Sequence, residues 1–419
     1  MEIRKLEGKE RYEAYLMAVY CFYMRVDDVE AEREKYEADT KEDWGAFDED
    51  GTLMARIINH KYDLYLDGNP VRTGGIGAVS TLPEYRNRGA IKEIFHKLLP
   101  AAYKDGEVLS LLYPFKHEFY RKQGYEVLTA WNEYTLTPGM LCQYGFDGEV
   151  KKWNMGDPVT DFMTVYDAFA PQFNLALART KEDMSKHLKV DKPYVDRQFS
   201  YVLKKNEQPV AYVIFTDIRH DPAAILQVEE CAWTGRDGFY AILGFLARFE
   251  SDYGTIKLSL PKGIDLLRIV KSPMAYDIQK TPQQGLMVRV INAKKLLETV
   301  KKPVDCDFTM QISDEIIKEN NQVLRVKGDC VEVLRSSLLQ EENDLLTSDM
   351  TSGADRGSDQ ISNTVTPDII MNVRTLGQLA VGCLNLDEAV LREDVTVNAK
   401  EEMLGCVFTE KKVFLGEHF

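Results

Sequence analysis

Long apolar runs and paired cysteines are both missing from this sequence of 419 residues. No apolar run approaches the roughly 18 residues that a membrane-spanning helix needs, and the charged start Met1–Lys5 leads into no apolar signal core. The seven cysteines are odd in number and include no C-x-x-C pair, which argues against a disulfide framework and a zinc site. We therefore expect a cytoplasmic protein without membrane contact or metal, whose thiols are free and buried.

Basic residues are in the minority. The chain has 52 Lys and Arg against 67 Asp and Glu, which gives a formal net charge of −15. No cluster of Lys and Arg rivals this acidic excess, so nucleic acid is not an expected partner. An acidic surface attracts polycationic small molecules and basic peptides, although it also serves solubility alone. The histidines show no metal-ligand spacing, and we expect structural or surface roles for His60, His96, His187 and His220.

The length fits roughly two to four domains, and the pattern of elements predicts three units. Residues 1–154 alternate in the order β-α-β-β-β-α-β-α-β, with one hairpin expected across 44–61, turning at 48–51, and a further hairpin across 62–73, turning at 67–70. Residues 155–300 repeat a strand–strand–helix–strand rhythm without an arginine- and glycine-containing turn, which predicts a degenerate second copy without cofactor. Residues 301–419 mix strands and helices, and the polar stretch 348–367 is typical of a loop or disorder.

The most informative stretch for chemistry is the turn that follows an expected strand, Gly75–Thr81. Residues 79–90 read V-S-T-L-P-E-Y-R-N-R-G-A, and a helix is expected to begin near Ala90. The backbone N–H groups of such a turn and the dipole of the helix together cradle a pyrophosphate. Gly89 lets the backbone approach phosphates without an intervening Cβ. A plain strand–turn–helix with solvated arginines would have the same residues, so a second motif has to decide.

That second motif follows the expected strand Val108–Tyr113. Residues 119–125 read F-Y-R-K-Q-G-Y. A tyrosine placed here lies beside a cofactor thioester, and its phenol can donate a proton to a departing thiolate as a general acid. We expect Phe119 and Tyr125 to be core aromatic residues instead.

Together the two motifs resemble the acetyl-CoA-binding motifs of the GNAT superfamily of N-acetyltransferases. The whole chain resembles, more narrowly, the enhanced intracellular survival (Eis) family, on the order of its units, on the strand Gly285–Val290 and on its ending, Val413–Phe419. This resemblance implies an α/β fold of tandem GNAT-like domains followed by a sterol-carrier-like C-terminal domain. Residues 1–154 would be catalytic, 155–300 cofactor-free and 301–419 sterol-carrier-like.

The resemblance also implies which residues bind acetyl-CoA, the expected cosubstrate. The strand residues Val79, Ser80 and Thr81 would pair with the pantetheine arm, and Phe115 and Lys116 would add a further contact. The phosphate turn would comprise Arg86, Asn87, Arg88, Gly89, Ala90, Ile91 and Lys92. The superfamily's usual second small residue of this turn is Ile91 here, which loosens the argument from glycine.

Two catalytic groups follow from the same resemblance. Tyr120 would be the proton donor, and the proton acceptor would be the C-terminal carboxylate of Phe419. The ending is apolar up to Leu415, so we expect it to be docked although chain ends commonly fray. A terminal carboxylate is a modest base, but it can relay a proton from a substrate ammonium through water. Glu417 and His418 are alternatives.

Acidic side chains near the end of the first helix are the expected substrate contacts. The resemblance places Asp27 and Asp28 in an open cleft for cationic amines, and Glu417 joins this set. A solvated acidic helix explains Asp27 and Asp28 equally well.

The function expected from these residues is acetyl transfer to amino groups of aminoglycoside-like polycations or of lysine side chains. The alternative is a lipid or sterol carrier, or an oligomeric scaffold, acting through the C-terminal unit. Tyr120 and the phosphate turn argue against a scaffold. The Eis resemblance also implies a homo-oligomer, in that family typically a hexamer.

Overall fold

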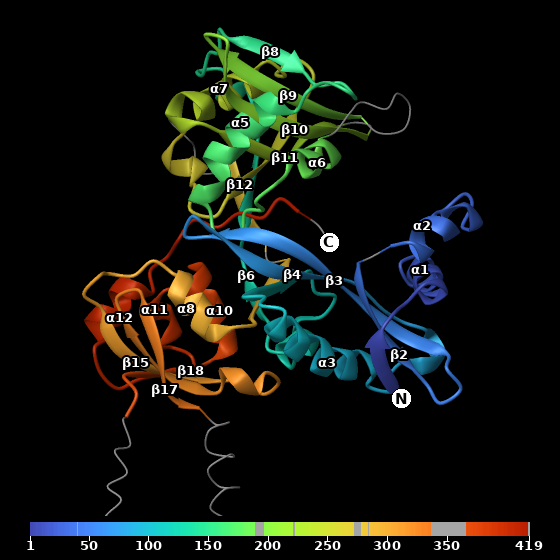
Figure 1. Cartoon of the computed structure of the whole chain (residues 1–419). Helices are drawn as coiled ribbons and strands as arrows, with labels where there is room; N and C mark the ends of the chain where they lie inside the picture. The colour runs from blue at the N-terminus through green and yellow to red at the C-terminus, as the bar shows by residue number, and fades with distance from the viewer. Residues whose placement is uncertain are drawn as a thin grey trace, which may run out of the picture.

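The computed structural model describes residues 1–39, 41–188, 197–220, 223–271, 278–283, 285–336 and 366–417 (Figure 1). The loop predicted at 348–367 lies outside the described residues except for its last two positions. Three sheets organise the molecule, and helices cover each of them. The fold is therefore mixed α/β, as the element pattern predicts.

The first sheet has seven strands and carries helices on both faces. In spatial order these are β1 (Glu2–Lys5), β2 (Glu42–Phe47), β3 (Leu53–Leu66), β4 (Asn69–Thr81), β5 (Leu109–Leu112), β14 (Leu286–Val290) and β6 (Glu126–Leu128). Apolar residues alternate along β2: Trp44 and Ala46 pack with helix α3 (Ala90–Lys104), whereas Phe47 packs with α1 (Lys9–Cys21). This alternation follows from the two-residue repeat of a strand and places α1 and α3 on opposite faces.

Both predicted turns, at 48–51 and 67–70, are confirmed, but the separation of the hairpins is wrong, because Leu53–Leu66 is one strand and Asn69–Thr81 is another. Strands β3 and β4 form one long hairpin, whose ladder runs from Leu66 and Asn69 to Ala55 and Thr81. The turn residues Asp67 and Gly68 both have positive φ, 49° and 87°, a backbone that matches the twist of a two-residue hairpin. The middle of β3, around Lys61 to Asp63, is less buried than its two ends, yet the strand is continuous.

The second sheet repeats the strand order of the first. Its strands are, in spatial order, β13 (Ile278–Gln283), β7 (Trp131–Leu136), β12 (Thr255–Pro261), β11 (Ala223–Trp233), β10 (Gln208–His220), β9 (Gln198–Lys205) and β8 (Glu149–Lys152). In each sheet four antiparallel strands lead to one parallel pair, β4 with β5 or β11 with β12, joined through α3 or α7 (Gly235–Ala247). This common plan agrees with the predicted repeat of a strand–strand–helix–strand rhythm, although β7 and β8 of the second sheet precede residue 155 and β14 of the first sheet lies within 155–300.

The two sheets also exchange strands. β14 is inserted between β5 and β6 of the first sheet, and β7 is inserted between β12 and β13 of the second. Each of the first two units therefore completes the other's sheet. Pairing of this kind couples the two units more tightly than a linker does, because separating them would leave unpaired backbone groups in both.

The third sheet is smaller and consists of β17 (Cys330–Ser336), β16 (Gln322–Lys327), β15 (Asp307–Ser313), β18 (Ile369–Asn372) and β19 (Thr396–Val397). Its helices are α10 (Val373–Val381), α11 (Leu386–Ala389) and α12 (Glu401–Val407). β18 is only four residues long and pairs in parallel with β15.

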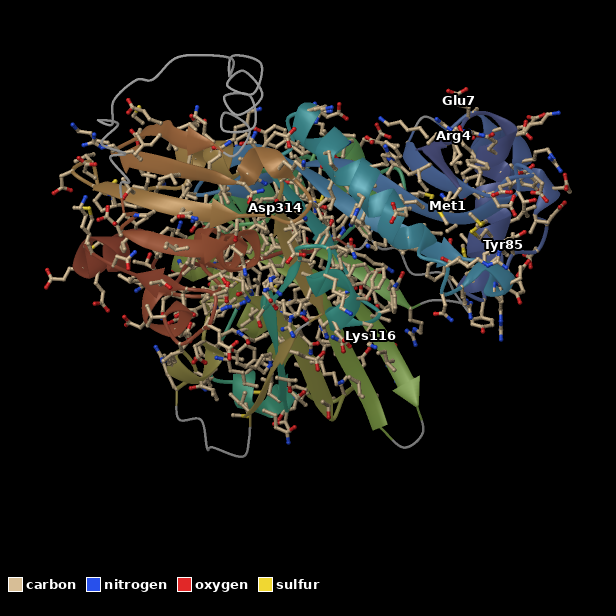
Figure 2. The ribbon with its side chains drawn as sticks, turned by 90° about the horizontal axis from the view of Figure 1, so that it is seen from below. Met1, Arg4, Glu7, Tyr85, Lys116 and Asp314 are labelled. Carbon is tan, nitrogen blue, oxygen red and sulfur yellow. The ribbon has the colours of Figure 1, made fainter. Side chains whose placement is uncertain are left out.

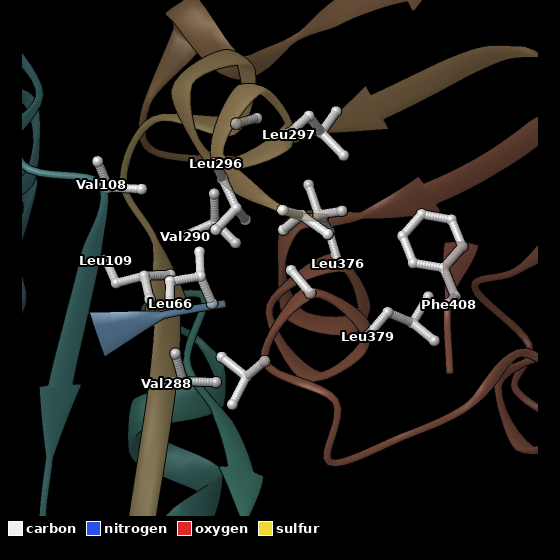
Figure 3. Close-up of a cluster of buried hydrophobic side chains, with 14 of the residues drawn as sticks. Leu66, Val108, Leu109, Val288, Val290, Leu296, Leu297, Leu376, Leu379 and Phe408 are labelled. Atoms are coloured by element: carbon white, nitrogen blue, oxygen red, sulfur yellow. The ribbon is translucent and has the colours of Figure 1, made fainter. Parts of the chain in front are cut away.

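One hydrophobic core joins the first and third sheets. Leu376 and Leu379 of α10 lie in the same cluster as Val288 and Val290 of β14 (Figure 3). A Cβ added at Gly377 would stand 3.4 Å from Val288 and 3.5 Å from Val290, so α10 rests directly on β14. The C-terminal unit is thus packed against the exchanged strand.

Truncation of Leu376 tests how much this shared core contributes. Leu376 is fully buried, so Leu376→Ala removes contacts and leaves a cavity, which costs about 2–5 kcal/mol. Urea unfolding measures the change. Leu391→Ala is the control, because Leu391 is 85% exposed and its truncation is expected to change stability by less than about 0.5 kcal/mol. Equal losses in the two variants would contradict a joint core.

All seven cysteines are free, but the expectation that they are buried is wrong for three of them. Cys231 and Cys306 are buried, whereas Cys142, Cys330 and Cys406 are exposed because they lie on the outer sides of their turn, strand and helix. Within the described part of the chain, no helix is both long enough and apolar enough to cross a membrane.

Candidate active site

The first sheet opens where β4 passes β5. Among the described residues, β5 pairs with β4 only through Thr73–Ile76. Just beyond, β4 bulges: Gly77 lies opposite Ile58 and Ser80 opposite Arg56, and Ala78 has a positive φ of 49°. A bulge bends its strand and adds twist, so it turns Gly77–Thr81 away from β5. The backbone edge of these residues is thereby open to a ligand.

A helix N-terminus faces the same opening. After β4 the chain makes a short turn, η2 (Pro83–Tyr85), and Asn87 and Gly89 adopt positive φ of 64° and 82° before α3 begins at Ala90. No side chain caps this end of α3. Its first N–H groups and its dipole are therefore available to an anion.

Together the open strand and the helix end bound a cavity of about 750 Å³. Ten of the twelve residues expected to contact the cofactor line it: Val79, Ser80, Thr81, Arg86, Asn87, Gly89, Ala90, Ile91, Lys92 and Phe115. Figure 2 labels Tyr85, which also lines the cavity, near the end of α3. The size suits a cofactor-sized ligand, and the donors suit a phosphate at one end and an extended amide chain at the other.

The remaining two expected contacts lie outside this lining. The guanidinium of Arg88 stands over the ring of Tyr85, 5.0 Å from its centroid. The ammonium of Lys116 is 3.3 Å from a carboxylate oxygen of Glu118, and Figure 2 shows Lys116 farther toward the middle of the molecule than Tyr85. Both side chains are long and exposed, so their present positions are set by these surface partners.

Tyr120 lies directly behind the cavity wall. It belongs to α4 (His117–Arg121), is 2% exposed and contacts the rings of Phe115 and Phe119 at centroid distances of 5.3 Å and 5.1 Å. Both of those rings line the cavity. Burial raises the pKa of Tyr120 well above its ordinary value, and its hydroxyl has no hydrogen-bond partner among the described residues. The phenol is therefore a protonated donor with a free hydrogen.

The two acidic residues after α1 do not reach the cavity. Asp27 and Asp28 are exposed, and Oδ1 of Asp28 accepts hydrogen bonds from the backbone N–H groups of Glu30 and Ala31 at 3.0 Å and 3.3 Å. Asp28 thus stabilises the short turn η1 (Glu30–Glu32), a local role that the spacing of these residues also allows.

The last described residues of the chain are docked between the first two sheets. Val413 exchanges backbone hydrogen bonds with Lys262, and Phe414 donates one to Asn174. The carbonyl of Glu417 accepts a hydrogen bond from Tyr113 Oη at 2.8 Å. In Figure 1 this red segment runs from the third sheet to a place between the second sheet and strands β3 and β4. His418 and Phe419 lie outside the described residues.

Glu417 has a different environment from the one expected of a substrate contact. Its side chain is 13% exposed, and Oε1 accepts a hydrogen bond from Nε of Arg179 at 2.6 Å. An arginine of the second unit thus neutralises it. Only Oε2, which is buried and has no hydrogen-bond partner among the described residues, is left to accept a hydrogen bond from a ligand.

Four residues of the cavity were not expected from the sequence. Cys21 and Phe22 come from the end of α1, and Tyr85 and Phe119 come from within the two motifs. Nothing in the sequence near Cys21 signals a ligand, because the side chain is brought to Thr81 only by the packing of α1 on β4. Phe119 packs against the core as predicted and also faces the cavity.

The geometry has the layout of a known family. Residues 2–128 match the family model for an acetyltransferase (GNAT) domain. This part of the chain is a GNAT domain. GNAT acetyltransferases use acetyl-CoA, and the open edge of β4 and the uncapped end of α3 fit its pantetheine arm and its pyrophosphate. No curated protein matches the chain in sequence.

Solved structures resemble the whole chain and not only the GNAT domain. A probable N-acyltransferase from Enterococcus faecalis V583 has a TM-score of 0.81 at 19% identity, with 100% of this chain and 99% of that chain covered. A GCN5-related N-acetyltransferase from Anabaena variabilis has a TM-score of 0.78 at 17% identity, and Eis1 from Mycobacterium abscessus has 0.78 at 16%; both are covered in full, as is this chain. The chain thus has an Eis-like fold, and the GNAT match and this fold support an N-acetyltransferase.

Proposed function

We propose that this protein transfers the acetyl group of acetyl-CoA to amino groups of cationic acceptors, either aminoglycoside-like polycations or lysine side chains. The observation that carries the proposal is the cavity formed by the bulged β4 and the uncapped α3, with Tyr120 behind its wall. The net charge of −15 supports a cationic acceptor, since an acidic surface concentrates cations near the site.

Each part of the site has a proposed role. Acetyl-CoA supplies the acetyl group as a reactive thioester. The backbone of Val79–Thr81 would hold the pantetheine arm and polarise the carbonyl through an N–H group. The turn residues Arg86–Lys92 would hold the pyrophosphate, and Phe115, with Lys116 beyond it, would close the cavity. These roles rest on the lining of the cavity and on the resemblance of the motifs.

Proton transfer would be divided between two groups. Tyr120 Oη holds a proton that it can donate to a departing thiolate. The carboxylate of Phe419 would take a proton from the acceptor ammonium, in line with the docking of the segment that leads to it. Asp27 and Asp28 would attract the acceptor from the exposed end of α1, and Glu417 would contact it only through Oε2.

We extend the proposal to the domains and the assembly. The units would be a catalytic GNAT domain over 1–154, a degenerate GNAT-like domain over 155–300 and a sterol-carrier-like domain over 301–419. The protein would be cytoplasmic and would assemble as a homohexamer. Buried side chains such as Phe308, Leu379 and Phe408 fill the interior of the last unit, which favours a structural role over lipid transport. An exposed apolar group at the end of α1, with Tyr20, Tyr23 and Met24, supports contacts between copies.

Thiol release from acetyl-CoA tests the proposed function. We expect turnover with a panel of aminoglycosides or with a lysine-containing peptide, and a loss of tenfold or more when one residue is added after Phe419, because the carboxylate is then displaced. A tag at the N-terminus is the control. Binding of acetyl-CoA without turnover on any amine would contradict the substrate class, and failure to bind acetyl-CoA would contradict the cofactor assignment.

A further inference from the structure

A buried charge cluster lies in the second unit, where the end of the chain crosses it. Arg179 follows the turn η4 (Ala170–Gln172), and its side chain is 0% exposed. Its guanidinium donates to both carboxylate oxygens of Glu230, at 2.7 Å and 2.8 Å, and to Oε1 of Glu417 at 2.6 Å. One arginine therefore joins β11 to the end of the chain with directional, charge-assisted hydrogen bonds.

Glu230 is held in its ionised form. It is fully buried, and burial alone would raise its pKa, but the Arg179 guanidinium and the His187 ring hold the pKa of Glu230 well below its usual range. Tyr212 donates a further hydrogen bond to it at 2.5 Å, and Nε2 of His187 lies 3.1 Å from its second oxygen. The cluster is thus rigid, with Arg179 fixed from one side and able to bind Glu417 on the other.

The backbone at Gly416 passes directly over the pair of Arg179 and Glu230. A Cβ on Gly416 would stand 2.1 Å from Oε2 of Glu230 and 3.0 Å from Nη2 of Arg179. A glycine is therefore required at this point for the close approach. Phe414, just before it, is buried against Phe169 and Phe173.

The cluster lies at the point of the second sheet that corresponds to the bulge of β4 in the first sheet. β11 last pairs with β12 at Val228, just as β4 last pairs with β5 at Ile76. Glu230 comes two residues after Val228, beside the bulge of β11, where the first sheet has the bulge that opens the cofactor cavity. The second unit thus has, at the corresponding point of its sheet, an ion pair that binds Glu417.

On the other side, the same residue touches the GNAT domain. The carbonyl of Glu417 accepts the hydrogen bond of Tyr113, which directly follows β5 and begins the segment that leads to Phe115 and Tyr120. Glu417 therefore connects Arg179 of the second unit with the catalytic side of the first.

We propose that Arg179 and Glu230 are positioning residues for acetyl transfer, because they fix Glu417 beside Tyr113. This inference rests on the proposed function for its catalytic part, but not for the anchoring itself. Replacing both members of a buried ion pair by apolar residues of similar volume is often nearly neutral for folding, so removing a merely structural pair would leave kcat of the folded variant unchanged. Removing a pair that positions the reaction would lower kcat, since a shift of about 1 Å can cost on the order of a hundredfold in rate.

The test compares three variants with the wild-type full chain. Arg179→Met with Glu230→Leu removes the anchor, and Gly416→Ala displaces the chain end while leaving the ion pair in place. The control is Lys186→Met with Glu182→Leu, which removes an exposed ion pair of α6 (Lys181–His187) with a 2.6 Å contact. Amide hydrogen exchange of Val413–Glu417 reports the anchoring, and kcat and KM report its consequence.

We expect both anchor variants to exchange amides in this segment about tenfold faster or more, and to lose about tenfold or more in kcat while KM for acetyl-CoA stays within about twofold. The control should match the wild type in every measurement. If amide exchange of Val413–Glu417 is unchanged in the anchor variants, Arg179 and Glu230 do not anchor this segment. If exchange is faster but kcat is unchanged, the pair anchors the segment without positioning the reaction. If the wild type acetylates no amine, the proposed function fails, while the exchange data still decide the anchor. If the double variant does not fold, the exchange and kcat of Gly416→Ala decide both the anchoring and the positioning.

Discussion

Replacing Tyr120 with phenylalanine is expected to lower kcat for acetyl transfer by tenfold or more and to leave KM for acetyl-CoA within about twofold. The phenylalanine keeps the ring contacts with Phe95, Phe115 and Phe119, so the cavity wall retains its shape. What is lost is the hydroxyl, and a positioned general acid contributes about 10²–10⁴-fold. Steady-state kinetics with saturating amine measure the loss.

The pH dependence adds a second readout for Tyr120. Burial raises the pKa of Tyr120 well above its ordinary value, so the folded protein keeps this proton at alkaline pH. Wild-type kcat should therefore show no decline between about pH 7 and pH 10 from loss of the donor. A decline in that range that disappears in Tyr120→Phe would contradict the environment described for this hydroxyl.

Tyr125→Phe is the matched control. Tyr125 is equally buried, its ring packs against Tyr120, and its hydroxyl is hydrogen-bonded to Ser110 at 2.7 Å. Its replacement should cost about 1 kcal/mol of stability and leave kcat unchanged. If Tyr125→Phe lowered kcat as much as Tyr120→Phe, the loss would reflect general damage to the aromatic cluster, and Tyr120 would not be the proton donor.

Gly89→Asp is expected to raise KM for acetyl-CoA by about tenfold or more with a much smaller effect on kcat. Gly89 precedes α3 with φ of +82°, and no atom lies within 4 Å of the site of an added Cβ. The substitution places a carboxylate at the helix N-terminus, where it would compete with the pyrophosphate for the same N–H groups. Direct binding of acetyl-CoA by calorimetry checks the effect independently of turnover.

The control for this substitution is Gly156→Asp. Gly156 has a similar φ of +92°, also has no atom within 4 Å of an added Cβ, and is exposed. Both variants add one charge and force a side chain into the left-handed region, which costs about 1 kcal/mol. Only Gly89→Asp should weaken the binding of acetyl-CoA. Equal binding by both variants would show that the end of α3 does not hold the phosphates.

Local patterns in the sequence were sufficient to predict those parts of the site whose residues lie close together along the chain. The turn and the start of α3 lie within a dozen residues of one another, so the motif predicts most of the cavity lining without knowledge of the rest of the chain. Side chains from other elements were not predictable in this way, as Cys21 and Phe22 show.

The sequence by itself determined the turn that enters α3, the position of Tyr120 close after it and the repeated strand–strand–helix–strand rhythm, because each depends on neighbours along the chain. The tertiary structure alone decided the exchange of β7 and β14 and the docking of Glu417. Glu417 meets Arg179 across 238 positions and Tyr113 across 304. Such pairings are selected by the burial and neutralisation of groups that no local pattern brings together, so only the folded chain shows that the second unit holds Glu417 against the first.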